Sequence, residues 1–318
     1  MKSQQIGLGN SFSLVSNFSN RSLGRIMVLF SAFLFYFTTV LIRWGGEVTD
    51  LSTADFTFAR FLGGAILVSP LFLYLRGLQG LRVNKVHFIV GRAIFNLGAV
   101  GCLYKCIETR TLAEGNILNL SYCIIVPLIS LFIYNVRDFR TLILSAFSFA
   151  GIALVVNSAQ PGGLFFSGVS TGTLWGCASG VSASLSIFSL KWSRDHNDTL
   201  TVLFYMFLIA LVFSTLVFWQ DLIWPDRQAF FYLVFATIAG ILGQFALTLG
   251  YGYVSAAQGS VLGTTRILIA ACLGSFITND AALHISGLLG ATVVFAVNYL
   301  IATGPDPVEE KYGRKISS

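Results

Sequence analysis

Arg266 lies near the middle of an apolar stretch that runs from Ala256 to Thr278. About ten residues, or roughly 15 Å of helix, separate it from either end, which is farther than its own side chain readily reaches. The apolar stretches contain no mid-span Asp or Glu that could pair with it. A permanently charged guanidinium suits a carboxylate or phosphate, so the residue predicts a buried site for an anion. A structural role, in which the guanidinium binds carbonyl groups at helix ends, is the alternative.

The surroundings of Arg266 favour the same interpretation. Gly263 falls on the same helical face and leaves room in front of the guanidinium. When the sequence is shifted onto itself by about 144 positions, Arg266 coincides with Tyr122 and Gly263 with Asn119. Two symmetry-related helices would then flank one central site to which all four residues belong.

Polar residues on neighbouring apolar stretches are further candidates for substrate contact. On the sixth stretch, residues 172–190, glycines recur along one stripe and serines along another. Both stripes could be packing faces, or the serine stripe could line a wet cavity, and the sequence leaves both interpretations open. The remaining candidates are Asn96, Tyr104 and Lys105 on the third stretch, Trp175 and Ser179 on the sixth, and Gln244 on the eighth.

Three residues are predicted to act in structure or gating. Glu108 lies one turn from Lys105 near the outer face, where a local ion pair and a substrate role for the lysine are both open. Glu108 would carry a coupling proton if it were desolvated. Arg60, about six residues into the second stretch, is predicted to anchor that helix at headgroups or at the acidic connection 47–55. Pro127 is predicted to kink the fourth stretch.

The elements that must position these residues are about ten apolar stretches, each close to the length that crosses a hydrocarbon layer of about 30 Å as a helix. Hydrophobic residues make up 55% of the 318 residues and charged residues only 11%, which is too little polar surface for a soluble domain of this size. We therefore predict an all-α polytopic membrane protein. The stretches are residues 26–42, 54–75, 87–108, 115–136, 141–157, 172–190, 200–218, 228–249, 256–278 and 283–302.

Several other classes of protein are not predicted. The formal charge of +6 resides in loops beside the apolar stretches, which argues against a nucleic-acid partner. The histidines are widely separated and the cysteines show no metal-ligand spacing, so neither a metal nor a cofactor is predicted. No nucleophile with its base, ring of filter charges or glycine-rich nucleotide loop is recognisable, which argues against an enzyme, an ion channel and an ATP-driven pump.

Basic residues concentrate on alternate connections, which predicts that both termini are cytoplasmic. The breaker at residues 157–163 divides the chain into two five-span halves, and an odd number of spans inserts the second half upside down relative to the first. The predicted segments are a flexible cytoplasmic tail (1–22), a first five-helix repeat (23–157), an extracytoplasmic linker (158–170), a second five-helix repeat (171–303) and a cytoplasmic tail (304–318).

Three strings carry a resemblance to a known family. They are FARFLGGA at 58–65, YKCIETRTLA at 104–113 and FAGIALVV at 149–156. Together with ten spans and short loops, they resemble the drug/metabolite transporter superfamily, in particular its EamA-type bacterial members, over residues 24–303. The resemblance implies a carrier in a bacterial inner membrane, with a central site between inverted halves that opens to each side in turn without ATP hydrolysis.

Family substrates are diverse, so the resemblance does not name a ligand. This chain departs from the family pattern at Pro127, about one turn later than usual, and in the ninth stretch, which has Arg266 and no proline. Both departures favour a small organic anion that bears a carboxylate or phosphate. An exporter of amino acids or amphiphilic drug-like compounds is the alternative, and a non-transporting receptor or scaffold is the alternative from another class. The sequence does not decide whether transport is coupled to a proton or to a counter-substrate. It also leaves open whether the protein is a monomer or a homodimer.

Overall fold

The computed structural model describes residues 8–109, 118–135, 138–158, 171–277, 284–307 and 311, and this part of the chain is helical without a strand. Eight helices are long and apolar enough to cross a membrane, and the shorter apolar segments Leu118–Tyr134 and Phe139–Val155 bring the number to ten. The prediction of an all-α protein with ten membrane spans is confirmed. The helices are α1 (Leu8–Val48), α2 (Thr53–Arg76), η1 (Leu78–Leu81), α3 (Val86–Thr109), α5 (Tyr122–Tyr134), α6 (Phe139–Ser158), α7 (Thr171–His196), α8 (Thr199–Phe218), α9 (Arg227–Gly250), α10 (Ala256–Leu262), α11 (Thr265–Ile277) and α12 (Ile285–Thr303).

Helix α1 begins at Leu8, well before the first span predicted from about Ile26. Residues 8–22, which the sequence analysis assigns to a flexible tail, therefore continue this helix. The segment contains no proline, so a helix nucleated in the apolar span can extend back through it at little cost per residue. Residues 1–7 lie outside the described part of the chain.

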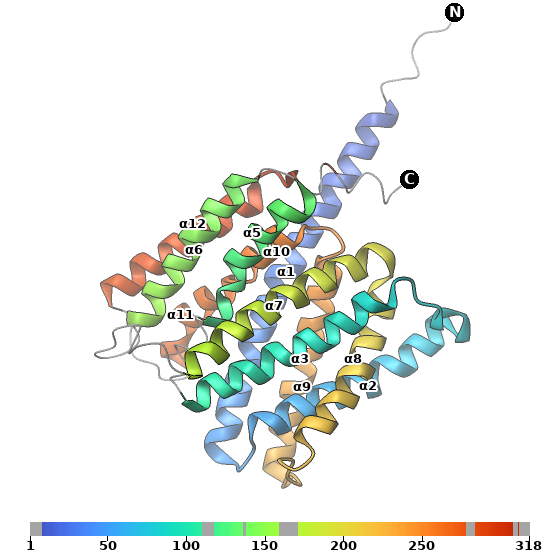
Figure 1. Cartoon of the computed structure of the whole chain (residues 1–318), viewed down its shortest axis with the longest axis vertical. Helices are drawn as coiled ribbons and strands as arrows, with labels where there is room; N and C mark the ends of the chain where they lie inside the picture. The colour runs from blue at the N-terminus through green and yellow to red at the C-terminus, as the bar shows by residue number, and fades with distance from the viewer. Residues whose placement is uncertain are drawn as a thin grey trace, which may run out of the picture.

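Each helix of the first half packs on a helix of the second half: α1 on α9, α2 on α8, α3 on α7, α5 on α10, and α6 on α12. If the halves are related by a two-fold axis, the α1–α9 and α3–α7 contacts are two copies of one contact, and the other three pairs lie on the axis. Figure 1 shows α6 and α12 at one edge of the bundle and α2 and α8 at the opposite edge, with α5 and α10 between them.

Gly151 of α6 and Gly290 of α12 lie in direct contact. A Cβ atom on Gly151 would lie 2.8 Å from the carbonyl oxygen of Gly290, and a Cβ atom on Gly290 would lie 2.5 Å from the carbonyl oxygen of Gly151. The two helices therefore touch backbone to backbone, as small residues permit in membranes. The two halves form inverted five-helix repeats.

Hydrogen bonds between connections agree with the predicted sidedness. Arg25 Nη2 near the start of the first span donates to Gly304 O just after α12, at 2.7 Å, so both ends of the bundle are on one side. The backbone N–H of Asn84 donates to Asn197 Oδ1 at 3.0 Å, which joins the α2–α3 and α7–α8 connections. These connections carry the basic residues that predict the cytoplasmic side.

Asp306 holds the first turn of α10 on that side. The Ser255 N–H donates to Asp306 Oδ2 at 3.0 Å, and Gln258 Nε2 donates to Pro305 O at 2.9 Å. Because Asp306 is buried, its removal leaves a buried N–H without this acceptor. We expect Asp306→Ala to lower the free energy of unfolding by about 1–2 kcal/mol, measured by thermal unfolding of the purified protein in detergent.

Asp221→Ala is the matched control for this prediction, because Asp221 is an exposed carboxylate in the α8–α9 connection. Its loss should leave the unfolding midpoint unchanged. Equal midpoints for the two variants would contradict the role assigned to Asp306.

Candidate functional site

The helices of the fourth and ninth spans are each interrupted by a short turn, at Ser121 and at residues 263–264. The fourth span is helical at 118–120, turns at Ser121 and continues as α5, whereas α10 ends at Leu262 and α11 begins at Thr265. The shift of about 144 positions carries Ser121 onto Thr265, so the two breaks correspond within two residues. Irregular backbone at membrane depth is tolerated where it is buried in protein or lines a cavity, and paired breaks of this kind mark binding sites in transporters.

The four residues that the sequence analysis places at the centre come together at these breaks. Arg266 Nη2 donates to Asn119 Oδ1 at 3.2 Å. A Cβ atom on Gly263 would lie 3.2 Å from the Tyr122 hydroxyl, and Arg266 is close enough to act electrostatically on that hydroxyl. Because Arg266 corresponds to Tyr122 and Asn119 to Gly263, these two contacts are the two copies of one symmetric arrangement.

A chain of hydrogen bonds fixes the orientation of Asn119. Its Nδ2 donates to Ser179 Oγ at 2.7 Å, and Ser179 Oγ donates to the carbonyl oxygen of Ala99 at 2.7 Å. With the Nδ2 group occupied by Ser179, the amide oxygen faces Arg266. The chain ties α11, the fourth span, α7 and α3 together through buried polar groups.

The electrostatic character of this centre is positive. Helices α5 and α11 begin at these turns, where N–H groups already bond within the chain, such as Ile124 N–H to Ser121 O and Ile267 N–H to Thr264 O. The positive charge is therefore that of Arg266, the second residue of α11. Within the described residues, the half-buried Arg266 makes no ion pair.

Arg60 and Gln244 form a separate pair. Arg60 Nη2 donates to Gln244 Oε1 at 3.1 Å, and the guanidinium carbon lies 5.0 Å from the centre of the Phe35 ring. Asp55, in the acidic connection expected to hold Arg60, accepts from the backbone of Ser52 and of Ile223. Gln244 of α9 and Phe35 of α1 thus lie beside Arg60. The anchoring of Arg60 at the acidic connection stays a prediction.

The two stripes of α7 are packing faces, which is the first of the two interpretations left open by the sequence. Gly176 and Gly180 pack against the fourth span, where Cβ atoms would meet Leu118. The serines pack against α3, through bonds such as that from Ser179 to Ala99. Trp175 is 41% exposed and does not join Arg266.

The remaining candidates are placed as follows. Lys105 is exposed near the end of α3, and Asn96 is half-buried on the same helix. The side chains of Tyr104 and Glu108 lie outside the described part, so their roles remain predictions. Pro127 is buried inside α5, and the span breaks at Ser121, six residues before it. The kink at Pro127 stays a prediction, because a helix can bend at a proline without being interrupted.

Sequence reasoning missed Arg92, which is only 3% exposed on α3. Arg92 Nη1 donates to Ser186 Oγ of α7, and its Nε has no hydrogen-bond partner among the described residues. Arg92 lies six residues from the start of α3, where an arginine is readily interpreted as an interfacial residue. Asn96, one turn further along the same face, was the available sign that this face of α3 is polar.

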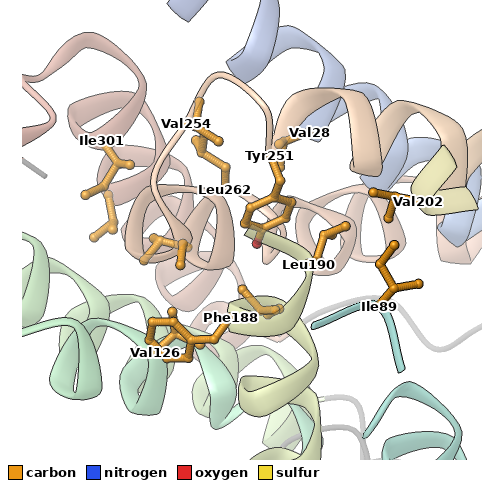
Figure 2. Packing of buried hydrophobic residues seen from close by; sticks show 14 residues of the cluster. Val28, Ile89, Val126, Phe188, Leu190, Val202, Tyr251, Val254, Leu262 and Ile301 are labelled. Atoms are coloured by element: carbon orange, nitrogen blue, oxygen red, sulfur yellow. The ribbon is translucent and has the colours of Figure 1, made fainter. Parts of the chain in front are cut away.

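Tyr251 links Arg92 to the centre. It is buried and close enough to act electrostatically on both Arg92 and Tyr122. Figure 2 shows its ring projecting from the turn after α9 into the cluster that contains Leu190, Val28 and Leu262. A Cβ atom on Gly259 would lie 2.9 Å from the Tyr251 hydroxyl, just as one on Gly263 would lie close to the Tyr122 hydroxyl. The two tyrosine hydroxyls therefore lie beside glycines that are one helical turn apart.

Comparisons with known proteins agree with this architecture. A solved structure described only as "Crystal structure of protein" matches with a TM-score of 0.73 and 16% sequence identity, over 93% of this chain and 99% of that chain, which shows a shared fold. None of the curated proteins matches the chain. The model of the EamA-like transporter family matches twice, at residues 22–157 and 170–303, once in each inverted repeat. The chain belongs to the EamA-like transporter family.

Proposed function

We propose that the protein is a secondary transporter that moves a small organic anion by alternating access at the centre between its two broken spans. The observation that carries this proposal is Arg266, which lies at mid-depth on the first turn of α11 and has the neutral amide of Asn119 as its described hydrogen-bond partner. A bacterial inner membrane is the proposed location, as the EamA-type resemblance implies.

An arginine at the centre of a span costs on the order of 3 kcal/mol or more. Asn119 orients the guanidinium without neutralising it, so the charge remains available to a ligand. The Tyr122 hydroxyl adds a donor near the same point. A cationic ligand would meet like charge here, which favours a carboxylate or phosphate.

The inverted repeats supply the second conformation that alternating access needs. The α1–α9 and α3–α7 contacts are copies of one contact that face opposite sides of the membrane. If one copy loosens while the other tightens, the central site changes the side to which it opens, because the two states are related by the internal symmetry. No hydrolysis of a nucleotide is required for this exchange.

The test is ligand-induced stabilisation of the purified protein by a panel of carboxylates, phosphates, amino acids and cationic drugs, followed by flux of the best anion in proteoliposomes. Anions should raise the unfolding midpoint most, because a ligand that binds the folded form stabilises it by mass action. Arg266→Gln should weaken the best anion about 10-fold, since a charge-assisted hydrogen bond contributes about 1.5 kcal/mol or more.

Arg227→Gln is the matched control, because Arg227 is exposed at the outer end of α9 and shares only its charge with Arg266. It should leave anion affinity unchanged. Stabilisation by cations alone, or equal anion affinity in the Arg266→Gln and wild-type proteins, would overturn the proposal.

A further inference from the structure

We propose, building on the proposed function, that the transported anion carries two anionic groups, one bound at Arg266 and the other at Arg92. Arg92 is a buried cation whose described partners include no carboxylate. A buried charge without a counter-charge is costly, and the hydroxyl of Ser186 does not neutralise it. An anionic group on a ligand would neutralise the guanidinium.

Two buried nitrogen atoms near the arginines are hydrogen-bond donors without an acceptor among the described residues. Arg92 Nε and Gln244 Nε2 are buried and have no hydrogen-bond partner among the described residues. Gln244 binds Arg60, whose charge lies close enough to Arg92 to repel it. Both unpaired atoms are donors, so the group that completes them must be rich in acceptors. A carboxylate or phosphate meets this requirement and also offsets the repulsion between the two arginines.

The spacing of the two arginines fits one extended ligand. Arg92 binds Ser186, and Arg266 binds Asn119, which in turn binds Ser179. The two serines are seven residues apart on one face of α7, a rise of about 10 Å. Each guanidinium can therefore hold its own anionic group, and the two groups belong at opposite ends of a short chain.

Two tyrosines lie in the same region. The hydroxyls of Tyr251 and Tyr122 lie beside Gly259 and Gly263, one turn apart, and Tyr251 is within electrostatic range of Arg92 as Tyr122 is of Arg266. Their hydroxyl groups add donors and their rings add apolar surface. The ligand class that this arrangement fits is a dicarboxylate, or a carboxylate that also bears a phosphate.

The experiment compares adipate with hexanoate, which share a six-carbon chain and differ in the second carboxylate. Affinities come from the dependence of the unfolding midpoint on ligand concentration. In the wild-type protein, adipate should bind at least 10-fold more tightly than hexanoate. In Arg92→Gln, that advantage should fall to less than 2-fold while hexanoate affinity stays within 2-fold of wild type, and Arg227→Gln should leave both affinities unchanged.

Ser186→Ala provides a second variant if Arg92→Gln does not fold, because it removes the hydroxyl that orients the guanidinium and keeps the charge. It should reduce the adipate advantage 2- to 5-fold. The proposal is overturned if hexanoate binds the wild-type protein as tightly as adipate, or if Arg92→Gln weakens both acids equally. Either of those results leaves the anion-carrier function standing, whereas binding of neither acid together with binding of cations would overturn that function as well.

Discussion

Asn119→Asp is expected to reduce anion affinity at least 100-fold while the protein stays folded. The new carboxylate would lie where Asn119 Oδ1 now lies, 3.2 Å from Arg266 Nη2, and would form an ion pair with it. The pair neutralises the guanidinium and also presents negative charge to the ligand, so the loss should exceed the roughly 10-fold effect of Arg266→Gln. Binding of the best anion and the unfolding midpoint measure the two effects.

A double-mutant cycle separates the ion pair from other consequences of the aspartate. In the wild-type background Asn119→Asp should change the unfolding midpoint little, because the new ion pair with the half-buried Arg266 offsets the lost hydrogen bond from Nδ2 to Ser179. In the Arg266→Gln background the same change should lower the midpoint, because the carboxylate is then buried without a partner. We expect a coupling of about 1–3 kcal/mol. Undiminished anion affinity in Asn119→Asp would show that Arg266 does not face the ligand.

The contact between Arg266 and Asn119 could be predicted from the sequence because two strong signals met there. A charge in the middle of an apolar stretch is costly, so Arg266 had to have a partner, and the internal repeat then brought Asn119 and Tyr122 to it. The ten spans follow from hydropathy in the same direct way. Both signals depend on position along the chain and require no knowledge of how a helix is rotated.

The parts that could not be predicted depend on helix rotation and on local backbone geometry. Gln244 binds Arg60 and Trp175 is exposed because of the way α9 and α7 are turned, and a polar stripe does not say which neighbour it faces. Ser121 breaks the fourth span although Pro127 is the stronger helix breaker in the sequence. Arg92 was not identified because burial within the bundle decides whether an arginine reaches water, and position along the chain does not give that burial.

Gly290→Ala is expected to destabilise the protein by about 3 kcal/mol, the largest stability effect among the changes considered. The added methyl group would lie 2.5 Å from the carbonyl oxygen of Gly151, 2.8 Å from Leu154 Cβ and 3.0 Å from the Val155 nitrogen. These atoms belong to the backbone or to the stem of a side chain, so α6 and α12 must move apart. Thermal unfolding in detergent measures the loss, and Gly101→Ala is the control, because its methyl group meets nothing within 4 Å and should be neutral or stabilising.

Gly151→Ala should cost less, about 1–2 kcal/mol, because, of its three close contacts, the Val294 Cγ2 can shift and the Val293 Cβ lies farther away, at 3.3 Å. The double variant should lose less than the sum of the two single variants, since helices already separated by the first methyl group have room for the second. Such non-additivity requires that the two glycines share one contact. Strict additivity, or a Gly290→Ala protein as stable as Gly101→Ala, would contradict the backbone contact between α6 and α12.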